Sequence, residues 1–183
     1  MCETVLLDEV EGDFIETGVW RGGACILMKG ILSAFGDLKR RVFVADSFQG
    51  LPKPDPEFAE DAGDKHHTFS QLAVSRHDVE ANFRKYGLLD SKVVFLEGWF
   101  KDTLPAAPIE KLAILRLDGD MYESTIQPLE ALYHKLCPGG FIIIDDYFLR
   151  PCAKAVDEFR SRNNITAPIL PIDGWAVWWR VDR

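Results

Sequence analysis

The chain of 183 residues is long enough for one domain with a full core, and its 47% hydrophobic and 27% charged residues are typical of a folded globular protein. A formal net charge of -8 argues against a nucleic-acid partner, because binding to phosphates depends on clustered Lys and Arg. No apolar run approaches the roughly 20 residues of a membrane span, and no basic segment precedes the first apolar stretch. We therefore expect a single cytoplasmic domain over residues 1–183, with no membrane partner and with a neutral or cationic small molecule as ligand.

Strands and helices alternate in the first part of the chain. After one or two helical turns within residues 1–10, the residues Asp13–Gly18 read as a short strand. A helix is predicted at Gly22–Phe35, where apolar residues recur at helical spacing, and a β-branched strand follows and ends on Asp46. This strand, helix and strand unit predicts a parallel pair with a right-handed crossover.

The segment from Gly50 to about Ser75 differs in composition from its neighbours. It begins with three prolines within five residues and continues with mixed acidic and His residues that show little apolar periodicity. A loop of this length inside a compact domain is usually functional or mobile. We predict a lid at about residues 50–75.

The alternation of helices and strands continues to the end of the chain. The pattern predicts a helix at 76–87, strands at 91–99 and 112–117, a helix from about 124 to 136 that is broken by Pro-Gly-Gly, a strand at 141–147, a helix at 152–163, and strands at 168–172 and 175–181. Strands that are apolar throughout and alternate with helices predict an α/β fold with a mostly parallel, doubly wound sheet.

Four of the predicted strands end in acidic residues. These residues are Glu16, Asp46, Asp118 with Asp120, and Asp145 with Asp146. Ligands of such sheets bind at the carboxyl ends of the strands, so we expect the acids to converge at one edge.

The turn after the first strand favours a nucleoside ligand without phosphates. Its glycines fall at 18, 22 and 23, which is not the spacing of a dinucleotide fingerprint, and the acid before the turn would repel a pyrophosphate. S-adenosylmethionine has no phosphate and carries positive charge. We predict that Glu16 meets its cationic end, that Gly18 lets the backbone approach it, and that Asp46 accepts hydrogen bonds from its ribose. A tight turn with no ligand is the alternative.

Asp118, Asp145 and Asp146 are expected at adjoining strand ends, where three carboxylates repel one another unless a cation joins them. All-oxygen ligands select Mg²⁺, Mn²⁺ or Ca²⁺ over zinc. Such an ion would hold a substrate hydroxyl and lower its pKa, and Asp120 would then take the proton as general base. The alternative is that these acids are solvated turn and cap residues.

Five stretches in order, DFIETGVWRGGA, VFVADSFQGLP, GWFKDTLP, LAILRLDGDMYEST and GGFIIIDDY, resemble the macrocin O-methyltransferase (TylF-like) family. The resemblance covers nearly the whole chain and implies the Rossmann-like class I methyltransferase fold, with an antiparallel C-terminal strand, S-adenosylmethionine and Mg²⁺. It also implies site residues, which are the metal ligands Asp118, Asp145 and Asp146, the catalytic base Asp120, and a donor pocket of Glu16, Gly18, Asp46 and Ser47.

The resemblance predicts an Mg²⁺-dependent O-methyltransferase that acts on a small hydroxylated acceptor, such as a sugar hydroxyl of a secondary metabolite or glycoside, and that forms a homodimer. Similar proteins carry a longer helical region before the first strand, whereas twelve residues precede Asp13 here. The alternative is therefore a short relative that binds S-adenosylmethionine or metal without turnover. An NAD-dependent oxidoreductase is disfavoured by the glycine spacing.

Overall fold

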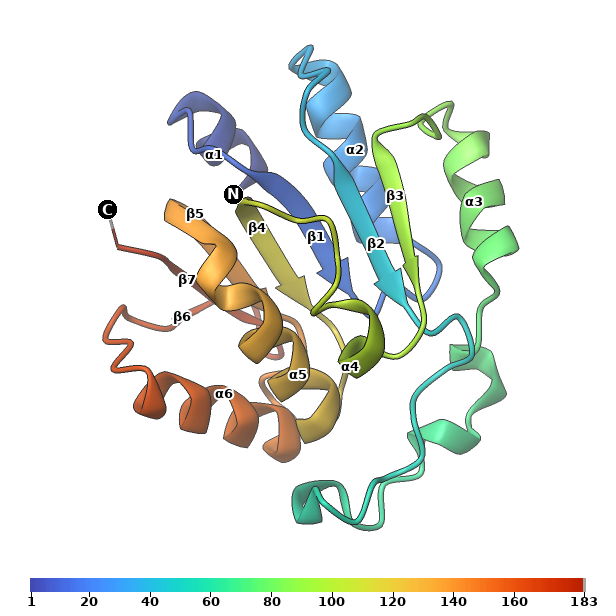
Figure 1. The fold of residues 1–183 in the computed structure, drawn as a ribbon, viewed down its shortest axis with the longest axis vertical. Helices are drawn as coiled ribbons and strands as arrows, with labels where there is room; N and C mark the ends of the chain where they lie inside the picture. Colours follow the sequence, from blue (N-terminus) through green and yellow to red (C-terminus); the bar gives the residue numbers. More distant parts are fainter. Residues whose placement is uncertain (183) are drawn as a thin grey trace.

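A seven-stranded sheet in the order β3-β2-β1-β4-β5-β7-β6 organises the computed structural model, which describes residues 1–182 (Figure 1). The strands β1 to β5 are parallel, β7 is antiparallel to β5, and β6 is antiparallel to β7. The bounds are β1 Asp13–Thr17, β2 Val42–Asp46, β3 Val93–Glu97, β4 Leu112–Leu117, β5 Leu136–Ile144, β6 Leu170–Pro171 and β7 Val177–Arg180. The predicted fold class, a mostly parallel doubly wound sheet with an antiparallel C-terminal strand, is confirmed.

Helices cover both faces of the sheet because successive strand residues point to opposite sides. Phe14 packs in the core that includes Leu32 and Phe83, whereas Ile15 packs with Leu129 and Phe159. The first face carries α1 Cys2–Leu7, α2 Gly23–Ala34 and α3 Arg76–Lys85, and the second carries α4 Phe100–Thr103, α5 Tyr122–Leu132 and α6 Arg150–Arg162. Short 3₁₀ turns lie at Ala59–Asp61, His66–Thr68, Ser70–Leu72 and Tyr133–Lys135.

The prediction for the junction of α5 and β5 was wrong. The helix ends at Leu132, and β5 begins at Leu136, so Pro138 and the two glycines after it lie inside the strand. The register shifts here, because Leu112 pairs with Leu136 while Ile114 pairs with Phe141. The irregularity accommodates the proline and glycines, which a regular central strand would exclude.

The carboxyl ends of β1 to β4 meet at one edge of the sheet, and residues 50–75 run along this edge as the teal segment of Figure 1. β1 pairs with β2 and with β4, and β4 pairs with β5, so the acidic strand ends are neighbours, as the topology predicts. Among residues 1–182, no helix has both the length and the apolar character that crossing a membrane requires.

Candidate active site

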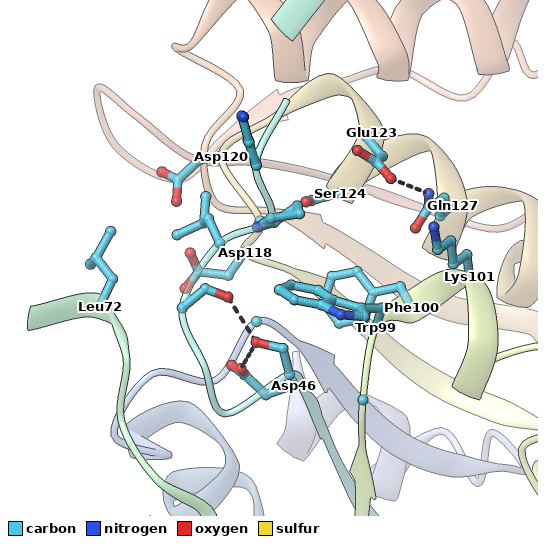
Figure 2. Close-up of a pocket in the computed structure, with 18 of the residues that line it drawn as sticks. Asp46, Leu72, Trp99, Phe100, Lys101, Asp118, Asp120, Glu123, Ser124 and Gln127 are labelled. Carbon is cyan, nitrogen blue, oxygen red and sulfur yellow. Dashed lines mark hydrogen bonds between the residues drawn. The ribbon is translucent and has the colours of Figure 1, made fainter. Parts of the chain in front are cut away.

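A cavity of about 440 Å³ lies at the carboxyl edge of the sheet (Figure 2). This volume falls in the range of sites for small molecules. Its wall is built by the turns after β1 to β4, the first turns of α4 and α5, and the segment 50–75; the lining residues include Gly18, Trp20, Asp46, Ser47, Leu51, Lys53, Leu72, Trp99, Phe100, Lys101, Asp118, Asp120, Glu123 and Gln127.

Gly18 brings the turn after β1 against the end of β4. Its φ is 84°, and a Cβ built on it would lie 1.7 Å from the carbonyl oxygen of Asp118. The two strand ends are also joined by the Asp118 N–H, which donates to the carbonyl of Thr17 at 2.9 Å. Only glycine fits at this position. Its backbone forms part of the cavity wall, where the sequence analysis expected the backbone to approach a ligand.

Asp46 fastens two turns of the cavity wall together. Its Oδ2 accepts from the backbone N–H of Val19 at 2.8 Å, and its Oδ1 accepts from that of Phe48 at 2.7 Å. Each carboxylate oxygen has a second lone pair, so Asp46 retains capacity to accept from a ligand hydroxyl. The hydroxyl of Ser47 donates to the carbonyl of Gly50 at 2.7 Å and thereby shapes the start of the segment 50–75.

Glu16 does not line the cavity, although the sequence analysis assigned it to the donor pocket. Its side chain is 2% exposed and lies beneath the turn, where Oε2 accepts from the backbone N–H of Cys25 at 3.1 Å and from its thiol at 2.9 Å. Its other oxygen pairs with Arg116. The carboxylate therefore contacts the start of α2 and the core, not the space that a ligand would fill.

Asp118, Asp145 and Asp146 come together as predicted for adjoining strand ends. Each offers one carboxylate oxygen, and the three oxygens lie within 4.8 Å of one another. Burial, with the other two acids nearby, raises the pKa of Asp118 to about 7. Burial and the proximity of Asp120 raise the pKa of Asp146 to about 6. The cluster has the geometry and the ligand chemistry that suit a hard divalent cation.

Arg116 is one residue of this site that the sequence analysis missed. It extends from β4 and contacts Asp118 Oδ2 at 2.7 Å and Asp145 Oδ1 at 2.5 Å, in addition to Glu16. An arginine within the otherwise apolar strand LAILRL is itself a signal, because a buried charge needs nearby partners. The acids that follow the strands were the available partners.

Asp120 occupies a backbone conformation that few residues adopt. Its φ is 59°, in the left-handed region that Asp and Asn tolerate better than most residues, and its N–H donates to Asp146 Oδ2 at 3.0 Å. Burial and the adjacent Asp118 raise its pKa. Figure 2 shows Asp118 and Asp120 on one side of the cavity, so the proposed base lies beside the carboxylate cluster.

Polar contacts join the segment 50–75 to neighbouring elements of the fold. Asp61 is 1% exposed and accepts hydrogen bonds from the first two N–H groups of α5. Glu60 pairs with Lys154 at 2.6 Å, and the indole of Trp20 donates to the carbonyl of Gln71 at 2.9 Å. The segment 50–75 therefore forms part of the cavity wall and is joined to α5, to α6 and to the turn after β1.

A sequence model of the family described as Macrocin-O-methyltransferase (TylF) matches residues 1–181. The chain belongs to this family. The macrocin O-methyltransferases use S-adenosylmethionine, and the chain is an enzyme of this kind.

Two curated relatives and one solved structure agree with the family assignment. The chain is 54% identical over 180 residues to the 8-demethyl-8-(2,3-dimethoxy-alpha-L-rhamnosyl)-tetracenomycin-C 4'-O-methyltransferase of Streptomyces olivaceus, covering 97% of this chain and 69% of that protein. It is 51% identical over 182 residues to the Mycinamicin III 3''-O-methyltransferase of Micromonospora griseorubida, covering 97% and 72%. The solved structure of the O-methyltransferase NovP matches with a TM-score of 0.93 and 52% identity, covering 100% of this chain and 76% of that one.

Proposed function

We propose that this family member is a divalent-cation-dependent O-methyltransferase whose acceptor is a sugar hydroxyl of a secondary metabolite or glycoside. The observation that carries the proposal is the position of Asp120 beside the three-carboxylate cluster at the cavity. Relatives named for methylation of a rhamnosyl tetracenomycin and of mycinamicin III support the acceptor class.

The residues of the cluster fit a metal ion such as Mg²⁺. Asp118, Asp145 and Asp146 supply oxygen ligands only, and the Arg116 guanidinium pairs with the first two of them. The raised pKa values of Asp118 and Asp146 reflect burial and mutual repulsion, which a divalent cation relieves. A bound cation would orient the acceptor hydroxyl and make it more acidic.

Methyl transfer then requires the chain to hold two substrates and accept one proton. The acceptor oxygen forms a bond to the methyl carbon as the carbon–sulfur bond of S-adenosylmethionine breaks, and the sulfonium becomes a neutral thioether. Asp120 accepts the hydroxyl proton. Asp46 binds the ribose, and the segment 50–75 excludes water, so that much of the rate gain comes from positioning.

Isothermal titration with S-adenosylmethionine, with and without Mg²⁺, tests both sites. We expect Asp46→Ala to lose donor binding but retain Mg²⁺ binding, and Asp145→Ala to lose Mg²⁺ binding. Release of S-adenosylhomocysteine with a panel of glycosides then tests turnover. Donor binding without release on any acceptor would support the alternative, a binding protein without turnover. The predicted homodimer is tested separately by sedimentation.

A further inference from the structure

Glu123 is a buried acid in the cavity wall that the proposed mechanism does not use. It lies in the first turn of α5 and is 6% exposed. Its Oε1 accepts from the amide of Gln127 at 2.9 Å, whereas its Oε2 is buried and has no hydrogen-bond partner. Within residues 1–182, Thr17 and Arg160 also carry such an atom, but neither of them lines the cavity.

Burying a carboxylate oxygen without a hydrogen-bond partner costs free energy. We therefore expect a ligand to supply a hydrogen-bond donor to this oxygen. Burial raises the pKa of Glu123, although Gln127 and the more distant Lys101 oppose this shift. Lys101 does not hydrogen-bond to Oε2 of Glu123, which has no partner in the described part of the chain. Glu123 lines the cavity, so a ligand N–H is a donor that can approach the carboxylate from that side once the atoms that enclose Oε2 move aside.

The inference rests on the proposed function, which determines the part of S-adenosylmethionine that lies beside Glu123. The methyl group must face Asp118 and Asp120, while Asp46 lies at the ribose. Figure 2 shows Asp118 and Asp120 at the left and Glu123, Gln127 and Lys101 at the right. Trp99 and Phe100 lie between Asp46 and Lys101 in this view. The adenine ring, at the end of the donor opposite the amino acid, therefore extends toward Glu123 and past apolar aromatic surface.

We propose that Glu123 accepts a hydrogen bond from the 6-amino group of the donor's adenine and thereby selects adenine over hypoxanthine. An ionised carboxylate only accepts hydrogen bonds, and the amino group is the donor on that edge of adenine. Hypoxanthine has a carbonyl oxygen in its place, which would face the carboxylate without a proton between them. Oε2 is enclosed, so a small movement of the neighbouring side chains accompanies the contact.

Titration of the wild-type protein with S-adenosylhomocysteine and S-inosylhomocysteine at pH 8 tests the inference without any variant. We expect S-adenosylhomocysteine to bind roughly 10- to 100-fold more tightly, as befits one hydrogen bond to a buried carboxylate. Equal affinities would overturn the role of Glu123 and leave the proposed function standing. No binding of S-adenosylhomocysteine would overturn the proposed donor site and this inference together.

The variant Glu123→Gln tests whether Glu123 causes the preference for S-adenosylhomocysteine over S-inosylhomocysteine. Its amide can donate to a carbonyl, so we expect the preference to fall to within about threefold. Glu130→Gln is the matched control, because Glu130 lies on the same helix but forms an exposed pair with Arg162. An unchanged preference in Glu123→Gln, as would follow if Lys101 satisfied Oε2 or if Glu123 contacted the acceptor, would overturn the inference.

Discussion

The backbone N–H of Glu123 donates to the carboxylate of Asp61 at 2.9 Å, across 62 residues of sequence. Asp61 also accepts from the N–H of Tyr122 at 2.7 Å, so one side chain from the segment 50–75 satisfies two N–H groups at the start of α5. Helix starts are normally capped by a residue of their own segment. Here the cap comes from the predicted lid and joins it to the helix.

Replacement of Asp61 by Ala should remove this cap. We expect a loss of about 1–2 kcal/mol in the free energy of unfolding, measured in urea, and faster amide exchange in the first turn of α5. Asp55→Ala is the control, since the carboxylate of Asp55 accepts a local hydrogen bond from the backbone N–H of Glu57 in the same segment. Equal losses in the two variants would show that Asp61 does not act as the cap.

Replacement of Asp120 by Asn should abolish most turnover while donor binding persists. Asn tolerates the φ of 59° and keeps the backbone contact to Asp146, so the change is confined to the carboxylate. We expect kcat to fall by a factor on the order of 10²–10⁴, with donor affinity within about threefold of wild type. Asp102→Asn, at an exposed site on α4, serves as control. Turnover retained in Asp120→Asn would remove this residue as the base.

Arg116 should contribute more to stability than exposed arginines do. In Arg116→Met the 2% exposed Glu16 loses its cation, and we expect a cost of roughly 3–5 kcal/mol in urea unfolding. In Arg162→Met the exposed pair with Glu130 is lost, at an expected cost below about 1 kcal/mol. Similar costs in both variants would mean that Glu16 is stable without its partner.

Gly18 and Gly36 both have a left-handed backbone conformation. Comparison of their Ala variants distinguishes the cost of backbone strain from the cost of steric overlap. Gly36 has φ of 68° and open space around its Cβ position, so Gly36→Ala should cost about 1 kcal/mol from strain alone. Gly18 has φ of 84° and the Asp118 carbonyl 1.7 Å from its Cβ position. Gly18→Ala should therefore unfold at clearly lower urea concentration than Gly36→Ala, and equal midpoints would contradict the close contact.

Ionisation of Glu123 should lower the free energy of unfolding as the pH rises. Its pKa is raised in the folded protein, so between the unfolded value near 4.5 and the folded value the native state binds more protons. Its contribution therefore falls as pH rises. Relative to wild type, Glu123→Gln should melt at the same temperature at pH 4 but roughly 1–3 °C higher at pH 8. A difference that does not change with pH would argue against a raised pKa.

The sequence predicted the topology well because the apolar strands and periodic helices dominate it. The strand Leu112–Leu117 has the predicted bounds, and the acids at neighbouring strand ends converge. The start of β5 was missed because Pro138 and the following glycines usually end a strand, and only pairing with β4 and β7 shows that they continue it.

Within the site, sequence reasoning located the acids better than it located their partners. The periodicity of β1 and the turn after it do not reveal that Glu16 lies beneath Gly18 and meets Cys25. Glu123 was missed because the predicted helix began at about 124, whereas α5 begins at Tyr122 and includes Glu123 in its first turn. Its burial and its unpaired oxygen depend on packing between α4 and α5, which no local pattern records.

The contact between Gly18 and Asp118 also limits how this enzyme can be redesigned. One added methyl group has no room there, so an insertion at either strand end would displace the carboxylate cluster. The segment 50–75 contributes Leu51, Lys53 and Leu72 to the cavity and is joined to α5 through Asp61. Exchange of this whole segment between relatives, with Asp61 retained, would therefore change one wall of the cavity while the strand ends stay intact.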